Sequence, residues 1–537
     1  MYFKPRSWLI GLPLLFISGI LALYAYVAFF PPSDSEENGD LSQAAFRVGT
    51  IFKVSRLHPY DKSSGEFMNV PIFNSLNHII IKNDEIIQFD FSDDLLESLE
   101  VSDDGREAVA HIRKNVYFHN GAILRANDVL YTLRKYLPDK IAGSMLINPN
   151  DFKFEIKDEY TVKLVSAKPF NWKPFFSALP ILNAQYERSW EGRDPADYIP
   201  MGTGPYRYAS YDKVTGYLRL ERFRKYWRGE PAIGYFDSIT YENNDAAMLA
   251  IIENRIDYLQ NLSPEDQDYV ANRVTSLVKL VEFPGSASYS LIFNTNNPKF
   301  SDWRVRRGIS HLVNRKEIVS DRFALNLIGV MADAPFYMTQ PATKPGVEPY
   351  EPDKGIKLIE SAGYKKDHGW YYKDGKRLEV EVLIVKYNAG YMHVLRLLQR
   401  QLGLAGVLMQ VKKVSEWSEL AELVKNRNFE IVFNDINENT LIGGAYARFK
   451  KNHPVNYSGY SDDVLEELFI KAQNSPPDLR LKMAVQARIR EKAPIITLFY
   501  KKVVIAVSSK YLGDWFYKDP YMLTYINEAG QKGAPTR

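Results

Sequence analysis

The sequence predicts an α/β protein of two or more lobes that follows one N-terminal membrane helix. Residues 289–323 give a strand, a polar turn and then two helices, and short strands and helices alternate in the same way over most of the chain. The 537 residues, 45% of them apolar, are ample for two or more lobes. An uncharged run over residues 8–30 has the length that a membrane helix needs.

Composition limits the classes of function that the chain can have. Its net charge of +3 gives no indication of nucleic acid binding. There is no Cys, which excludes disulfides, thiolate catalysis, thiolate metal sites and a lipid-modified N-terminal cysteine. Aromatic residues make up 13% of the chain, which favours aromatic cores and leaves open a cleft that stacks on ligands. No cofactor is indicated.

Residues 1–30 are predicted to form an uncleaved signal anchor, and residues 31–45 a polar, acidic linker. Lys4 and Arg6 precede the uncharged run, which places the N-terminus in the cytoplasm. The run is longer than the roughly 7 to 15 residues of a signal-peptide core, and no small-x-small cleavage site follows it. The alternative is a cleaved signal that releases the chain into the periplasm. In both cases the rest of the chain lies outside the cytoplasm.

Strand and turn signals follow one another from Phe46 onward. We expect a helix around Val70 to Leu76, an alternating strand over residues 107–112, and a helix capped by Asn127. His119 could be a metal ligand, but no second ligand lies at a suitable spacing on the same element. A hydrogen-bonded structural histidine is therefore favoured.

The segment MGTGPY, residues 201–206, contains a Gly-x-Gly pattern. A dinucleotide-binding loop is disfavoured, because Pro205 follows at once and no third glycine opens a helix. Strands over residues 218–222 and 238–241, and a helix over residues 246–253, complete an α/β unit.

The strand, turn and helices of residues 289–323 have clear boundaries. Asp302 is expected to cap the first helix, whose apolar face is Val305, Ile309, Leu312 and Val313. Arg304, Arg306 and Arg307 are expected mostly on its solvent side. Asn314 and Glu317 resemble the capping box of the second helix.

The second half of the chain continues the alternation and contains the candidate ligand-binding residues. A hairpin is expected through residues 373–375, and a helix over residues 392–402 precedes a strand over 407–411 and a helix over 417–425. A strand over residues 430–433 would deliver Asn434, Asp435 and Asn437 to an edge loop, the usual place for binding residues in α/β folds. Together with Tyr289 they are the candidate site. The alternative for Asp435 is a plain loop cap.

These motifs resemble those of the extracellular solute-binding proteins of family 5, which serve peptide, nickel and some sugar ABC importers. The resemblance covers about Phe46 to Trp515, and among the matching residues are Phe118, His119, Gly121, Asp128, Gly202, Gly204, Tyr206, Trp227, Asp257, Asn294, Asp302, Arg306 and Ile318. It implies a two-lobed periplasmic-binding-protein fold, class II-like, with an extra subdomain in lobe 1. Lobe 1 would span 46–284 with the insertion at about 71–199, lobe 2 would span 285–498, and residues 499–537 would return to lobe 1.

The resemblance also implies a function. The chain would be the substrate-binding component of an ABC importer, a monomer without catalytic residues that captures a peptide or similar solute and delivers it to a membrane permease. In peptide-binding members an aspartate that aligns with Asp435 holds the ligand's α-ammonium. Ile436, Asn437 and Glu438 replace the usual Tyr, Pro and Asp, which leaves peptide specificity open. The alternatives are a membrane-tethered binding or sensor protein without transport and, less favoured because HExxH and GxSxG are absent, an enzyme.

Overall fold

The computed structural model describes a large part of the chain. It covers residues 41–54, 56–61, 71–82, 86–90, 94–138, 148–170, 172–177, 179–260, 262, 264–273, 277–320, 328–331, 348–385, 391–437, 446, 448–453, 455–473, 479–513, 523 and 526–529. The predicted membrane helix and most of the predicted linker lie outside these residues. Among the helices that are described, none combines the length and the apolar character needed to cross a bilayer.

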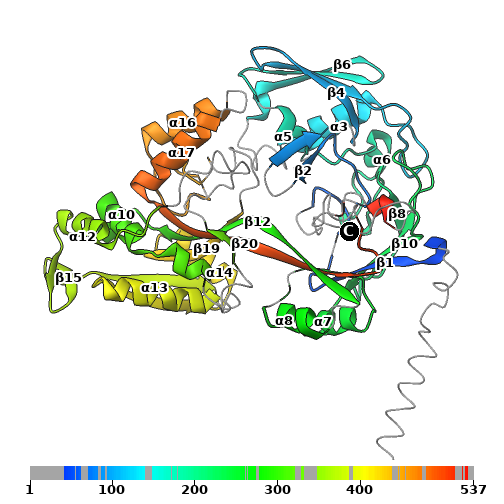
Figure 1. The fold of residues 1–537 in the computed structure, drawn as a ribbon. Helices are drawn as coiled ribbons and strands as arrows, with labels where there is room; N and C mark the ends of the chain where they lie inside the picture. The colour runs from blue at the N-terminus through cyan, green and yellow to red at the C-terminus, as the bar shows by residue number, and fades with distance from the viewer. Residues whose placement is uncertain are drawn as a thin grey trace, which may run out of the picture.

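One mixed sheet runs through both lobes (Figure 1). Its strand order is β18-β17-β19-β12-β20-β11-β1-β10-β9-β8, and β13 also pairs with β20. The strands are β1 Ala45–Thr50, β8 Tyr206–Tyr211, β9 Leu218–Arg222, β10 Tyr235–Thr240, β11 Tyr258–Gln260, β12 Val278–Phe293, β13 Ile328–Met331, β17 Glu379–Val385, β18 Leu408–Val414, β19 Ile431–Asn437 and β20 Ile495–Ser508. In Figure 1 the long antiparallel strands β12 and β20 run from one lobe into the other.

The lobe 1 half of the sheet has helices on one face and the inserted subdomain on the other. Helices α7 (Asn244–Ile252) and α8 (Pro264–Arg273) bury Ile251 and Val270 against Leu259 of β11. On the opposite face, Phe46 and Phe236 belong to a larger buried cluster that continues into the subdomain. The sheet and the subdomain therefore share one hydrophobic core.

The subdomain lies between β1 and β8 in the sequence. A four-stranded antiparallel sheet and a two-stranded hairpin form its β-structure: β4 Leu96–Val101, β5 Glu107–Ile112, β7 Thr161–Ser166 and β6 Phe152–Asp158, with β2 His78–Lys82 and β3 Ile86–Asp90. Its helices are α3 Ala126–Tyr136, α5 Trp172–Ser177 and α6 Ala184–Ser189, and short 3-10 turns are η4 Pro149–Asp151 and η5 Pro195–Asp197. Residues 41–43 and 526–528 form the 3-10 turns η2 Leu41–Gln43 and η8 Ile526–Glu528.

The MGTGPY segment is held against the backbone of residues 71–72. Gly204 N–H donates to the carbonyl of Ile72 at 2.9 Å, and Tyr206 N–H donates to that of Pro71 at 2.9 Å. A Cβ atom at Gly202 would overlap with the Ile72 carbonyl, so only glycine allows this approach. Residues 71–76 form turns and an isolated bridge instead of the predicted helix, because their carbonyls bind this segment.

His119 locks the same segment from the other side. Its Nε2 lies 3.1 Å from the Gly204 carbonyl and its Nδ1 accepts from Gly202 N–H at 3.4 Å, so the neutral ring with its proton on Nε2 satisfies both partners. The side chain is buried beside Phe223, with the ring centroids 5.0 Å apart. These contacts confirm the predicted structural role of this histidine.

We expect His119 to make the fold acid-sensitive. Burial lowers its pKa from 6.5 to about 4, so between these values the unfolded chain binds a proton that the folded chain does not. The stability that the neutral His119 contributes is fully present above pH 6.5 and is lost as the pH falls toward 4. The loss is about 3 kcal/mol, at 1.36 kcal/mol for each pH unit between the two pKa values. The check is urea unfolding at pH 7 and pH 4.5 of the natural chain and of His119→Gln, which cannot titrate. The difference in unfolding free energy between the natural chain and His119→Gln should be smaller at pH 4.5 than at pH 7. An equal difference at both pH values would contradict the prediction.

The lobe 2 half of the sheet is covered by helices on both faces. On one face α10 (Trp303–Leu312), α12 (Pro352–Ser361) and α13 (Met392–Leu404) pack on β12, β17 and β19. On the other, α14 (Trp417–Lys425) packs on β17 and β18, and α16 (Asp463–Gln473) and α17 (Leu479–Lys492) cover Ile292 and Ile436. Shorter elements are α9 Pro298–Ser301, α11 Arg315–Ser320, β14 Lys365–Asp367, β15 Trp370–Lys373 and β16 Lys376–Arg377.

Several predictions from local sequence signals are confirmed here. The Asp302 carboxylate accepts from Arg304 N–H at 2.9 Å and caps α10, and Asn314 Oδ1 accepts from Glu317 N–H at 3.1 Å at the start of α11. Asp374 and Gly375 both have positive φ, as the predicted hairpin between β15 and β16 requires.

Two further predictions about helices are wrong. Asn127 does not cap α3, because the Asp128 carboxylate accepts from Arg125 N–H at 3.0 Å and moves the helix start to Ala126. Arg306 is only 2% exposed rather than on the solvent side of α10. Its guanidinium donates to the carbonyls of Phe300, Ser301, Lys492 and Ala493, so it joins α10 to the last turn of α17.

Candidate functional site

Strand ends from the two lobes point toward each other along β12 and β20. In lobe 2, β19 is antiparallel to β12 and ends with Asn437 opposite Ala287, beside the pair Ser288 and Tyr500. In lobe 1, β11 is antiparallel to β20 and ends with Gln260 opposite Ile505. Since a strand rises about 3.3 Å per residue, the step along β20 from Tyr500 to Ile505 separates the two sets of strand ends by roughly 16 Å. A small ligand could contact both sets.

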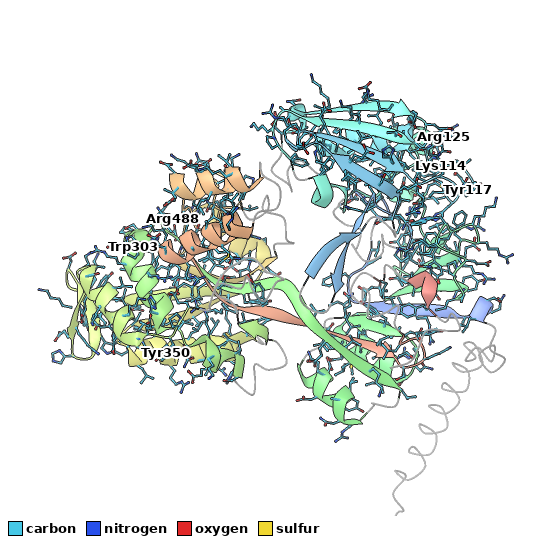
Figure 2. All side chains as sticks on the ribbon, turned by 45° about the horizontal axis from the view of Figure 1, so that its top comes forward. Lys114, Tyr117, Arg125, Trp303, Tyr350 and Arg488 are labelled. Atoms are coloured by element: carbon cyan, nitrogen blue, oxygen red, sulfur yellow. The ribbon has the colours of Figure 1, made fainter. Side chains whose placement is uncertain are left out.

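The pairing of β12 with β20 is irregular between these strand ends. The register of β12 against β20 shifts between Pro284 and Ser288, where β12 uses more residues than its partner. Such an irregularity disturbs the ladder of hydrogen bonds and bends the strand. Figure 2 shows Trp303 and Arg488 in one lobe and Lys114 and Arg125 in the other, with β12 and β20 between them. The predicted lobe boundaries, 284/285 and 498/499, fall in these two strands and stay predictions.

Asn294 fixes the start of the strand that carries the predicted site. Its side-chain amide donates to the carbonyls of Arg427 at 3.0 Å and Phe429 at 2.9 Å. Its backbone N–H donates to the carbonyl of Glu430 at 2.9 Å. The turn that leads into β19 is thereby attached to the end of β12. These contacts give Asn294, one of the residues that match the family, a structural function.

The predicted edge loop after residue 433 is wrong. Asn434, Asp435 and Asn437 belong to β19, which pairs with β12 up to Asn437. Asparagine and aspartate disfavour strands, which is why the sequence suggested a loop. Pairing with β12 outweighs that preference. On its other side β19 pairs with β17 only at Ile431 and Val432, so the segment from Phe433 onward has β12 as its described neighbour.

Tyr289 and Asp435 occupy opposite positions on β12 and β19. The Tyr289 ring is 5% exposed and packs in an aromatic cluster with Tyr391, Phe433 and Phe499, at centroid distances of 4.2, 5.4 and 5.4 Å. The ring therefore anchors the strand end in the lobe 2 core. The side chains of Asp435 and Asn437 lie outside the described residues. A ligand contact for any of the three stays a prediction.

Asn434 contributes a buried polar group to the same strand end. It lies opposite Ser290 and is 7% exposed, and its Oδ1 accepts no hydrogen bond from any described residue. Ser290 is occupied with Thr497, whose Oγ1 lies 3.2 Å from its own Oγ. An unpaired buried acceptor costs about 1 to 3 kcal/mol, so a donor from a ligand or water would be stabilising there.

The sequence prediction missed a lobe 1 residue at the opposing strand end. Phe52 lies two residues after the end of β1 at Thr50 and is 69% exposed. Its N–H donates to Thr50 Oγ1 at 3.0 Å, and Lys53 Nζ donates to the Val214 carbonyl at 2.9 Å, which fixes the turn against the β8–β9 hairpin. In the sequence TIFKV this position looks like the interior of a strand. Only the end of β1 at Thr50 reveals an exposed aromatic ring here.

The lobe 1 strand end is itself rigid. Arg47 on β1 donates to both carboxylate oxygens of Asp257 through Nε at 2.8 Å and Nη2 at 2.9 Å, and its backbone N–H donates to the same carboxylate. Burial raises the pKa of Asp257, and the bonds from Arg47 act against that increase. This pair ties β1 to the residue before β11.

Among the described residues, no group of three His, Asp or Glu side chains could hold a metal ion.

Comparison with known proteins places the chain in a family. The model of the bacterial extracellular solute-binding proteins, family 5, matches residues 90–447. The oligopeptide-binding protein AppA of Bacillus subtilis is 24% identical over 524 residues, which are 94% of this chain and 90% of AppA. The glutathione-binding protein GsiB of Escherichia coli K12 is 26% identical over 454 residues, which are 79% of this chain and 83% of GsiB.

Solved structures show the same fold. The ABC transporter substrate-binding protein CtaP of Listeria monocytogenes matches with a TM-score of 0.75 and 20% identity, over 88% of this chain and 96% of CtaP. NikA of Brucella suis in complex with Fe(III)-EDTA matches with a TM-score of 0.74 and 18% identity, over 87% and 96%. With the family match over more than half of its length, the chain belongs to the bacterial extracellular solute-binding proteins of family 5.

Proposed function

We propose that the chain is the substrate-binding component of an ABC importer, which captures a peptide or similar solute between its lobes and delivers it to a membrane permease. The observation that carries the proposal is the pair of opposing strand ends on β12 and β20. The names of relatives that bind oligopeptides and glutathione support the solute class. Membership of a solute-binding family also confirms the expectation that the chain is not an enzyme.

Binding and closure are coupled in this proposal. A ligand shifts the population toward a closed form only if it binds that form more tightly, which requires contacts to both lobes. Asn434, Asp435 and Asn437 would contact the solute from lobe 2, and Tyr289 would support the strand opposite them. Phe52 would contribute an apolar surface from lobe 1. The irregular stretch of β12 after Pro284 is the place where the lobes would rotate.

The family is extracellular by its description, so the folded part acts outside the cytoplasm. We further propose that residues 8–30 stay uncleaved and anchor the protein to the cytoplasmic membrane, with Lys4 and Arg6 inside. The protein would act as a monomer. A tethered binding protein can supply a permease as well as a free one, because it stays close to the membrane.

Native mass spectrometry of the full chain, purified in mild detergent without denaturation, tests the solute class. We expect a distribution of adducts at peptide masses that disappears when the protein is unfolded and refolded without ligand. A single adduct at a non-peptide mass would indicate a different solute. An empty protein that gains no thermal stability from peptide mixtures would contradict the importer proposal and favour a tethered protein without a transport role.

A further inference from the structure

A pocket outside the strand-end site lies between helices α3 and α6 of the subdomain. Its volume is about 360 Å³, and it is lined by Asn127, Leu130, Tyr131, Arg134, Lys135, Arg188 and Glu191. Figure 1 places both helices in the subdomain, away from the lobe 2 end of β12 and β20. In Figure 2, Arg125, which precedes α3, lies far from the lobe that carries Trp303. A ligand here would not compete with a solute held at the strand ends.

The pocket is held by the packing of the two helices on each other. The buried Asp128 carboxylate accepts from Arg125 N–H at 3.0 Å and from Ala184 N–H at 2.8 Å, so one side chain ties the first turn of α3 to the start of α6. Thr132 Oγ1 accepts from Leu182 N–H at 3.2 Å one turn further along. The backbones of the two helices therefore keep fixed relative positions without a ligand.

The charge of the pocket is unbalanced. Glu191 pairs with Lys135, with the carboxylate oxygen 2.6 Å from Nζ. Arg134 and Arg188 have no carboxylate within 4.0 Å among the described residues. The lining residues therefore carry three cations against Glu191, a net charge of +2, and the buried Asp128 carboxylate behind them interacts with Arg188. The two guanidinium groups are the cations best suited to bidentate contact with oxyanions.

Tyr131 lies between the cations and has an unused hydrogen-bonding group. Arg188 Cζ lies 5.1 Å from the centroid of its ring and Lys135 Nζ lies 5.5 Å from it. The Tyr131 hydroxyl is buried with the Lys135 ammonium beside it as a donor, and no described group accepts the hydroxyl proton. A buried phenol normally donates its proton to an acceptor, and none of the described residues supplies one here. A ligand oxygen could therefore take this position, beside the cations.

We infer that this pocket binds a phosphate monoester group. A phosphate dianion matches the net charge, accepts from both guanidinium groups and offers an oxygen to the Tyr131 hydroxyl. A carboxylate brings one charge and two oxygens, which satisfies fewer of these donors. Leu130 and the Tyr131 ring form an apolar wall for the organic part of the ligand. The group could come from a small soluble phosphate ester or from a lipid headgroup.

Calorimetric titration of the full chain with glycerol phosphate and with inorganic phosphate, at about 50 mM salt, tests this inference. The double variant Arg134→Gln/Arg188→Gln should weaken binding at least about tenfold, since it removes two charge-assisted hydrogen bonds to the phosphate. Tyr131→Phe should weaken it several-fold. The control is Arg106→Gln/Lys157→Gln, which removes the same charge from exposed positions of the same subdomain and should change the affinity less than twofold.

Flotation with vesicles that contain phosphatidic acid, compared with phosphatidylcholine alone, distinguishes the two sources of phosphate. The inference is supported if the natural chain binds the soluble esters and the double variant does not. It is also supported if the natural chain and the control variant bind the vesicles and the double variant does not. The inference is overturned if neither probe binds at millimolar concentration. It is also overturned if the control variant weakens binding as much as the double variant, because the effect would then be one of overall charge.

Discussion

Gly202→Ala is expected to destabilise lobe 1 by about 4 kcal/mol or more, among the largest effects that a single substitution produces. The added Cβ would overlap with the carbonyl of Ile72, which is backbone and accepts a hydrogen bond from Gly204. The contact cannot be relieved by a rotamer change. Residues 71–72 and 202–206 would have to separate, and His119 Nδ1 would lose the hydrogen bond that it accepts from Gly202 N–H.

Urea unfolding followed by tryptophan fluorescence measures this effect, and Gly403→Ala is the matched control. Gly403 lies in α13 with open space around its Cβ position, so alanine there should leave stability unchanged or raise it by up to about 1 kcal/mol through helix propensity. Equal effects of the two substitutions would mean that the close approach at Gly202 is relieved without cost.

Asp435→Ala is expected to weaken the binding of a solute with a free amine by on the order of 2 to 5 kcal/mol, the cost of leaving a buried charge unpaired. Asp435 lies on β19 opposite Tyr289, near the strand end that faces lobe 1. A carboxylate there would form a charge-assisted hydrogen bond in a site with little water, where such bonds are strong.

The control for Asp435 is made on the ligand. A peptide whose amino group is acetylated has no ammonium, so its affinity should be the same for the natural chain and for Asp435→Ala. Asp435→Asn should lose most of the discrimination between free and acetylated peptide while it keeps the size of the side chain. If Asp435→Ala binds the free peptide as tightly as the natural chain does, the assignment of this residue is wrong.

Features that depend on a few neighbouring residues could be predicted from the sequence. The Asp302 cap, the turn at Asp374 and Gly375, and the helix over Trp417–Lys425 all follow from local backbone chemistry. His119 could be assigned a structural role because no second ligand accompanies it.

Features that depend on distant partners could not be predicted. Arg306 was expected in solvent because α10 buries its apolar stripe on the opposite side, and nothing local indicates that the end of α17 packs on the remaining face. Residues 71–76 look helical, but the carbonyls of Pro71 and Ile72 accept hydrogen bonds from Tyr206 N–H and Gly204 N–H instead of from a helix. Strand β19 extends through Asn434 to Asn437 because it pairs with β12. Neither segment's own sequence indicates that the two strands are neighbours.

The contacts of Arg306 also decide how the two connections between the lobes can deform. Arg306 binds the carbonyls of Lys492 and Ala493 immediately before β20 begins, so that strand starts from a point fixed to α10 and cannot slide along its own axis. The neighbouring strand β12 has spare length between Pro284 and Ser288, where more of its residues span the same stretch of β20. If the lobes rotate as proposed, β12 can change its path over several residues, whereas β20 has one extra residue, Leu498, between Thr497 and Phe499. The axis of rotation should therefore pass close to β20.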